Sequence, residues 1–306
     1  MSEGKQFRVN RESRTGYCFV LPAVLFMAAM IIYPLIYNFN LSFRDMDVMS
    51  FKNNSAKYVG LSNFVYLFTS DSVFLDALKH TFQFTIRSLV IQFSIGFALA
   101  LFFNKKFRLS GMVRGSLIMG YMMPMSVTGL LFKNLFATST SEGVINAALA
   151  ALGFIHSSQP IGWLVSEKYA LWAVTLANCW VGIPFNMMLL VAGLSSIDQT
   201  TYEAATIDGA NSLQCFCNIT MPLMKSSIVS VLMLGFIYTF KVFDLVYIMT
   251  NGGPVNATQV LSSYSYKLSF SQYNFSLGAA VAVVLFVCLM CVGFAYLFLV
   301  RKEEVE

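Results

Sequence analysis

Residues 203–222 read EAATIDGANSLQCFCNITMP, a short polar stretch between two long apolar segments. Thr200 precedes Glu203 by three positions, which is capping-box spacing and predicts a helix that starts just after Thr200. Gly209 is expected to end or bend that helix, and Pro222 marks the approach to the next apolar segment. The stretch therefore predicts a polar helix and turn that join two membrane spans on one side of the bilayer.

The composition is that of an integral membrane protein. Of the 306 residues, 57% are hydrophobic and 11% are charged, and the mean hydropathy is +0.66. Soluble domains carry about 25% charged residues, so most of this chain's surface is expected to face lipid. The net charge of +5 does not indicate nucleic acid, because the basic residues gather at the edges of the apolar segments rather than in one patch.

Six apolar segments are long enough to cross a hydrocarbon core of about 30 Å as helices. They fall near residues 17–39, 81–103, 116–137, 169–194, 226–249 and 274–300. The sequence thus predicts an all-α membrane protein with one domain over 17–300, a polar segment before it at 1–16 and a short tail after it at 301–306. The first apolar segment is longer than a signal-peptide core and no small-residue cleavage site follows it, so we expect it to be retained.

Lysine and arginine set the expected orientation, since they are enriched on the cytoplasmic side of membrane proteins. With the N-terminus inside, the inner segments hold 11 basic residues and the longer outer segments hold 6. Both termini and the 195–225 loop are therefore predicted to be cytoplasmic. Four basic residues in the outer segment 40–80 run against this assignment.

The outer segments are expected to hold short surface elements. Segment 40–80 is too polar to span and is interrupted at Gly60 and Asn63, so we expect a loop with one or two short helices. Residues 143–153 are apolar but too short to cross, and they predict an interfacial helix or a lid on the outer face.

No pattern in the sequence indicates catalysis or a metal site. The six cysteines and the two histidines, His80 and His156, do not have metal-ligand spacing. The sequence has no glycine-rich phosphate loop either, so this chain is not expected to bind ATP itself.

The 203–222 stretch resembles the signature loop of permease subunits in ATP-binding-cassette importers. The resemblance is carried by Glu203-Ala204-Ala205, Gly209, Ile219 and Pro222, with Met221 in place of the usual leucine. In that family the loop forms a coupling helix that docks into a cleft on a cytosolic ATPase. The resemblance implies the same role here, with Glu203 and Asp208 offering charges to a basic partner at the rim of the contact.

A second motif resembles the carbohydrate branch of that family. Residues 243–254, FDLVYIMTNGGP, look like the Phe-Asp…Thr-x-Gly-Gly-Pro segment of carbohydrate-type permeases, and residues 180–185, WVGIPF, extend the resemblance. The Gly-Gly-Pro element is typical of the first of two permeases, the larger maltose-transporter subunit type, although the large inserted outer domain of that subunit is absent from this sequence.

The resemblance also implies partners and a location. These are a second permease, two cytosolic ATPase subunits that bind ATP and Mg²⁺, an extracytoplasmic sugar-binding protein, and the cytoplasmic membrane of a prokaryote. The resemblance implies alternating access, in which ATP binding closes the ATPases and draws the helices near 200–210 together. The expected function is one half of the membrane channel of a sugar importer.

Four charged residues fall inside the expected spans: Arg87, Lys133, Lys241 and Asp244. Ionisable groups at this depth are costly and usually face a cavity or a partner. Lys241 and Asp244 are three positions apart and are expected to share one face of the fifth helix, with Tyr238 and Tyr247 extending the stripe. The stripe is either a wall of a sugar path or an internal salt bridge that holds the helix in place. Arg87 and Lys133 are expected to reach to the outer interface.

The fourth span carries a second polar line. Asn178, Gly182 and Asn186 recur every four residues, and they either contact sugar or make hydrogen bonds between helices. Pro184 removes one backbone hydrogen bond and is expected to kink the helix.

Three alternatives remain open on the sequence alone. The same importer type could carry glycerol phosphate or another small polar solute, although a phosphate would favour more than the single cation Lys241. An ion-coupled secondary transporter would work without ATP and would tolerate the loss of Glu203. An intramembrane enzyme that used Lys241 and Asp244 would lack a nucleophile or metal set nearby.

Overall fold

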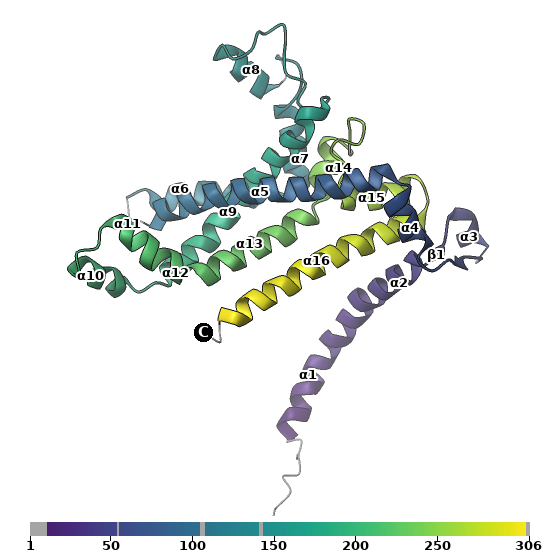
Figure 1. The fold of residues 1–306 in the computed structure, drawn as a ribbon, viewed down its shortest axis with the longest axis horizontal. Coiled ribbons are helices and arrows are strands. Elements are labelled where there is room, and N and C mark those ends of the chain that lie inside the picture. Colours follow the sequence, from purple (N-terminus) through teal and green to yellow (C-terminus); the bar gives the residue numbers. More distant parts are fainter. Residues whose placement is uncertain (1–10, 54, 105–107, 141–142, 304–306) are drawn as a thin grey trace, which may run out of the picture.

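The computed structural model describes residues 11–53, 55–104, 108–140 and 143–303, and nearly all of them are helical (Figure 1). By length and composition, four helical segments could cross a membrane: Gly16–Ser42, Ser72–Asn104, Glu167–Ser195 and Phe275–Phe298. Two further helix pairs would each count as one bent span, which brings the total to as many as six. The all-α prediction is therefore confirmed, and the count of six spans stays a prediction.

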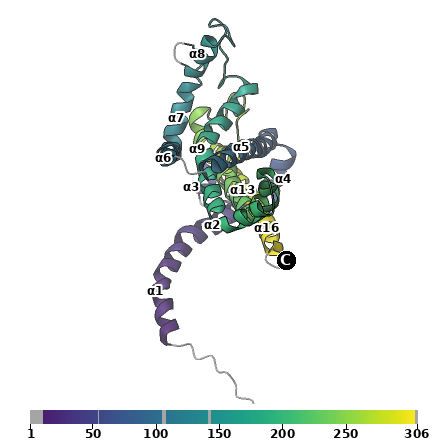
Figure 2. The same cartoon turned by 90° about the vertical axis from the view of Figure 1, so that its left-hand side faces the viewer.

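The first span is a rod that leaves the rest of the molecule. It consists of α1 (Arg11–Met27), a π-helical turn η1 (Ala28–Ile32) and α2 (Tyr33–Ser42). α2 packs along α16 (Phe275–Glu303), whereas α1 curves away from the bundle (Figure 2). Residues of this span are apolar and exposed, as expected of a helix that faces lipid or another subunit.

The segment after the first span folds into short elements. A two-stranded antiparallel pair, β1 (Arg44–Asp45) and β2 (Lys57–Tyr58), accompanies α3 (Val48–Lys52) and α4 (Ser62–Thr69). The short helices agree with the expected loop, and the strand pair was not predicted because each strand has only two residues. Gly60 adopts a φ of +58°, which a glycine takes without strain, and turns the chain from β2 into α4.

The centre of the fold is a pair of long helices, α5 (Ser72–Asn104) and α9 (Glu167–Ser195), which pack along most of their length. Gly96 permits the close approach, since a Cβ at this position would lie 2.9 Å from the Cβ of Asn186. α5 starts at Ser72, nine residues before the predicted span, because its polar first turns stay helical beyond the apolar run. α9 is unbroken through Pro184, so the predicted kink produces no break in the helix.

The predicted third span is two helices rather than one. α6 (Ser110–Tyr121) and α7 (Met125–Leu135) meet at an angle of 93°. Pro124 is the N-cap of α7, and a proline also keeps the residue before it out of the helical region, so the helix must end here. α7 leads to α8 (Val144–Ala151), a short helix that projects from the bundle (Figure 1) and falls in the predicted interfacial segment.

The predicted fifth span is also broken. α13 (Lys225–Phe240) ends before Lys241, and α14 (Asp244–Met249) begins three residues after that end. The break frees backbone groups that need partners inside a membrane, and the carbonyl of Val242 accepts a hydrogen bond from the Ser262 hydroxyl. Ser262 lies in α15 (Leu261–Tyr266), which continues through the π-helical turn η3 (Lys267–Ser271).

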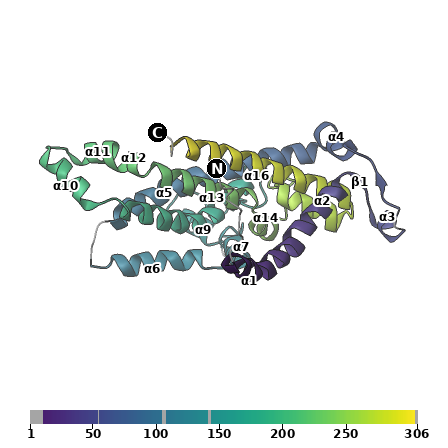
Figure 3. The same ribbon diagram turned by 90° about the horizontal axis from the view of Figure 1, so that it is seen from below.

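The polar stretch at 203–222 folds into two short helical arms. α10 (Gln199–Ile207) is followed by α11 (Ser212–Cys215), the π-helical turn η2 (Phe216–Thr220) and α12 (Met221–Leu223). These arms lie at one end of the bundle, and β1 and α3 lie at the other (Figure 1). The C-terminal end of α16 points toward the α10 end (Figure 3), so this end gathers the segments that charge asymmetry grouped on one side.

Candidate functional site

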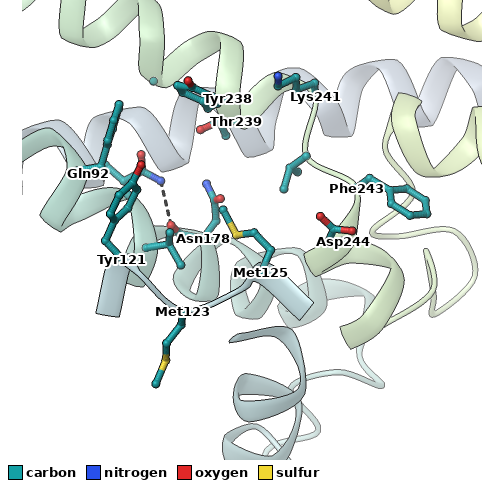
Figure 4. Close-up of a pocket in the computed structure, with 15 residues that line it drawn as sticks. Gln92, Tyr121, Met123, Met125, Asn178, Tyr238, Thr239, Lys241, Phe243 and Asp244 are labelled. Carbon is teal, nitrogen blue, oxygen red and sulfur yellow. Dashed lines mark hydrogen bonds between the residues drawn. The ribbon is translucent and has the colours of Figure 1, made fainter. Parts of the chain in front are cut away.

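A cavity of about 500 Å³ opens between α5, α9, α13, α14 and the turn that joins α6 to α7 (Figure 4). Its polar and charged lining groups are Gln92, Tyr121, Asn178, Tyr238, Thr239, Lys241 and Asp244. Four of the six residues that the sequence placed on a substrate path therefore meet in one cavity: Asn178, Tyr238, Lys241 and Asp244. They come from two helices and a helix break that are far apart in the sequence.

Aromatic rings form one wall of this cavity. Tyr121 stacks on Phe185 with 5.5 Å between ring centroids, and Phe185 meets Tyr238 edge to face at 5.7 Å. The Lys241 ammonium lies 5.3 Å from the centre of the Tyr238 ring, within cation–π range. Tyr238 is 57% exposed, so its ring remains available to a ligand. The wall combines flat apolar faces with a cation at their edge.

Amide groups form the opposite wall. Gln92 is buried, and its Nε2 donates to the backbone carbonyl of Asn178 at 3.2 Å while its Oε1 accepts from Asn186 Nδ2 at 3.4 Å. The Gln92 amide occupies the space over Gly182, where a Cβ would lie 2.2 Å from Gln92 Cδ. The Asn178 Nδ2 group is buried and has no hydrogen-bond partner. An unused buried donor in a cavity wall can be satisfied by a ligand oxygen.

The prediction that Lys241 and Asp244 share one face of a continuous helix is wrong. Lys241 is the C-cap of α13, and Asp244 is the first residue of α14, with two non-helical residues between them. Both are within the described chain, and no ion pair joins them there, although both line the cavity (Figure 4). Asp244 stands in the first turn of α14, where a carboxylate is favoured by the helix dipole.

Two predicted path residues lie elsewhere. Asn186 is buried against the helices, where its Nδ2 donates to the Gly182 carbonyl at 2.8 Å and to Gln92, so it makes the hydrogen bonds between helices that were one of the two alternatives. Tyr247 lines a second cavity of about 610 Å³ nearer α8, together with Lys133, Asn134 and Asn251.

The predicted coupling loop presents its signature residues at the surface. Glu203, Ala204, Asp208 and Gly209 are exposed, and Ala205 and Ile219 are half-buried. Ile207, between them, is 87% exposed, which is unusual for a large apolar side chain at the end of a bundle. Pro222 is exposed and lies inside α12 rather than ahead of the next helix. The Tyr202 hydroxyl bonds the Thr220 hydroxyl at 2.9 Å and ties α10 to η2.

The start of α10 differs from the predicted capping box. The N-cap is Asp198, whose carboxylate accepts from the Thr200 backbone N–H at 3.0 Å, because the helix begins at Gln199 and not after Thr200. This hydrogen bond holds the pKa of Asp198 below its usual range. The end agrees with the prediction: Gly209 has a φ of +83°, and the Ala210 N–H bonds the Ala205 carbonyl at 2.9 Å, which closes the helix as a Schellman motif.

Several lining residues escaped the sequence analysis. Gln92 carried a signal, since it is a polar residue in the middle of a predicted span. Tyr121 and Phe185 carried none, because aromatic residues are common throughout the apolar segments of this chain. Nothing in the sequence pairs these residues with Tyr238.

Comparison with known proteins identifies the family. Residues 92–305 match the family described as binding-protein-dependent transport system inner membrane component, and this chain belongs to that family. It is therefore a transport subunit of the inner membrane and not an enzyme.

The chain is also similar to individual permeases over nearly its whole length. The sulfoquinovosyl glycerol transport system permease protein SmoG of Agrobacterium fabrum is 32% identical, with 92% of this chain and 89% of the relative covered. The trehalose/maltose transport system permease protein MalF of Thermococcus litoralis is 30% identical, with 94% of each covered. The lactose transport system permease protein LacF of Rhizobium radiobacter is 32% identical, with 94% and 95% covered.

Solved structures share the fold. The crystal structure of a bacterial alginate ABC transporter in complex with alginate pentasaccharide-bound periplasmic protein contains a chain with a TM-score of 0.81, 21% identity and 98% coverage of both chains.

Proposed function

We propose that this chain is one permease half of an ATP-driven importer that carries a saccharide across the cytoplasmic membrane by alternating access. The observation that carries the proposal is the 500 Å³ cavity, which combines aromatic faces with amide, hydroxyl and charged groups. Sugar rings have apolar C–H faces and hydroxyl edges, so a wall of rings bordered by hydrogen-bonding groups matches them. Three similar permeases belong to transport systems named for saccharides or glycosides.

The partners follow from the same proposal. A second permease would complete the channel, two ATPase subunits would bind ATP and Mg²⁺, and an extracytoplasmic binding protein would deliver the sugar. The exposed surface of α10 around Glu203, Ala204 and Ile207 would dock into the ATPase, and the α10 end of the bundle and both termini would face the cytoplasm. The small side chains of this surface allow close contact, and Ile207 supplies an apolar anchor.

A phosphate substrate is less well supported. The central cavity has one lysine among its lining residues, and Asp244 in the same lining would repel an anion. Asn178, Thr239 and Gln92 are neutral groups that suit hydroxyls. A neutral sugar therefore fits the cavity better than glycerol phosphate.

The docking proposal can be tested by co-purification. The chain would be produced with its genomic neighbours, extracted in mild detergent and compared with Glu203→Arg at the α10 surface and Asp45→Arg at the opposite end of the bundle. We expect the wild type and Asp45→Arg to retain an ATPase and a second permease, and Glu203→Arg to lose the ATPase alone. Equal ATPase recovery in all three would refute docking through α10.

Transport itself is tested in proteoliposomes that contain the whole complex. Uptake of saccharides should require ATP and the binding protein, and Lys241→Gln and Asn178→Ala should lower uptake while the complex still assembles. ATP-independent uptake that survives Glu203→Arg would support an ion-coupled transporter instead.

A further inference from the structure

An aromatic row leads away from the central cavity. It consists of Phe243, Tyr247, Tyr266 and Phe270, with ring centroids 5.1 Å apart between the first two, 5.2 Å between the tyrosines and 5.0 Å between Tyr266 and Phe270. Phe243 and Tyr247 are stacked at 19° on the segment that begins α14, and Tyr266 and Phe270 follow about one helical turn apart on α15 and η3. The row is formed by two segments some 20 residues apart in the sequence.

The row connects two cavities. Phe243 lines the central cavity of about 500 Å³ beside Lys241 and Asp244. Its neighbour Tyr247 lines the second cavity of about 610 Å³ beside Lys133 and Asn134. A stacked pair of rings therefore forms the boundary between two spaces, each of which also presents charged and amide groups.

The rings are open to a ligand. Phe270 is 61% exposed and Tyr247 is 40% exposed, whereas Phe243 and Tyr266 are half-buried and support them. The tyrosines also bring hydroxyls, and a hydrogen bond with the Tyr247 side chain raises the pKa of Tyr266. The row thus offers flat apolar faces with hydrogen-bonding edges, as the central cavity does.

A surface that only faces lipid looks different in the same molecule. The groove between α13 and α16 is lined by apolar side chains, and its two polar groups, Ser230 and Tyr296, bond each other at 3.1 Å. No unused polar group remains there for a sugar. The aromatic row is instead bordered at both ends by lysine, amide and carboxylate groups that do not pair with one another in the described residues.

We propose that Phe243, Tyr247, Tyr266 and Phe270 form a stacking track that guides a saccharide of two or more rings between the outer and the central cavity. Successive sugar rings would lay their C–H faces on successive aromatic faces, while their hydroxyls would reach the polar groups of the two cavities. Because a track engages several rings at once, its contribution grows with the length of the saccharide. This inference rests on the proposed function and narrows the substrate class to oligosaccharides.

The test compares saccharide lengths in the complete reconstituted importer with its binding protein. The probes are glucose, maltose, maltotriose and maltotetraose, and a second series of galactose, lactose and galacto-oligosaccharides of three or four rings. The variants are Tyr266→Leu and Phe270→Leu, which remove a ring face but keep apolar bulk, and Tyr266→Phe, which keeps the face. Phe154→Leu, an exposed aromatic in the α8 lobe outside the row, is the matched control.

We expect the two leucine variants to lower kcat/KM about 5- to 10-fold for three- and four-ring sugars and less than about 2-fold for two-ring sugars, which corresponds to about 1–1.4 kcal/mol for the longer sugars. Tyr266→Phe and Phe154→Leu should resemble the wild type. Equal losses at every length, no loss at any length, or a wild type that carries single-ring sugars only would overturn the track.

Subunit recovery separates the remaining explanation. If the leucine variants lose the second permease on purification while Tyr266→Phe retains it, the row is a subunit contact and the track is refuted. If the wild type takes up neither series, the proposed function fails for these sugars and the track falls with it. Uptake without length dependence refutes the track alone.

Discussion

The contact between Gln92 and Gly182 gives the sharpest prediction about the central cavity. A methyl group at Gly182 would lie 2.2 Å from Gln92 Cδ, whereas ordinary contacts begin near 3.4 Å. The buried amide would have to move by about 1 Å and would lose its bonds to the Asn178 carbonyl and to Asn186. Overpacking costs about 1–3 kcal/mol and each lost hydrogen bond about 1 kcal/mol, so Gly182→Ala should destabilise the protein by about 2–4 kcal/mol.

The assay is reversible unfolding in mixed micelles, titrated with SDS, with Gln92→Ala and the double variant completing a cycle. Gln92→Ala alone should cost about 1–3 kcal/mol, because the Asn178 carbonyl loses its donor. The double variant should be close to Gln92→Ala, since the methyl then enters an empty space. Gly115→Ala is the control, because a Cβ there meets nothing within 4 Å and a helical alanine is favoured by up to about 1 kcal/mol.

The reasoning is refuted if Gly182→Ala unfolds at the same SDS concentration as the wild type, or if the two single effects simply add. Either result would mean that the amide does not occupy the space over Gly182.

Three further predictions concern regions outside the cavity. Gly209→Ala should destabilise α10 by about 1–2 kcal/mol and weaken ATPase recovery, while Gly209→Asn should be tolerated, because φ is +83° and a Cβ would meet nothing within 4 Å; equal behaviour of the two variants would contradict this. Asp198 has a lowered folded-state pKa, so its cap stabilises α10 above the unfolded pKa of about 4 and is lost as the pH falls through the folded value; hydrogen exchange over 196–210 should rise between pH 6 and pH 3 in the wild type, whereas Asp198→Ala should exchange fast at both. Tyr264→Phe should cost about 1–3 kcal/mol in the SDS titration, because the Tyr264 hydroxyl donates to the buried Asp71 carboxylate at 2.6 Å and burial raises the pKa of that tyrosine; an unchanged midpoint would show that water replaces the hydroxyl.

The broken helices show how function can depend on departures from the sequence pattern. The apolar run through Lys241 predicts one continuous helix, yet the chain breaks there and places Lys241 and Asp244 on different segments that line one cavity. The break is compatible with a membrane because Ser262, twenty residues later, satisfies the Val242 carbonyl. The other break, at Pro124, could have been read from the proline itself.

The site residues divide in the same way. The sequence singled out Asn178, Tyr238, Lys241 and Asp244 because polar and charged side chains are costly in a membrane span, and the fold gathers all four. It could not place Asn186 against Gln92, nor Tyr266 and Phe270 beside Tyr247, because these contacts join helices that are remote in sequence.

The sequence alone determined the helical membrane class, the polar loop at 203–222 and the glycine that ends its helix, because hydropathy, capping and the conformational freedom of glycine are properties of neighbouring residues. Only the tertiary structure decided where helices break, which amide fills the space over Gly182 and which rings stack into a row. Those features depend on partners supplied by distant segments, and their cost or benefit does not exist until the helices pack.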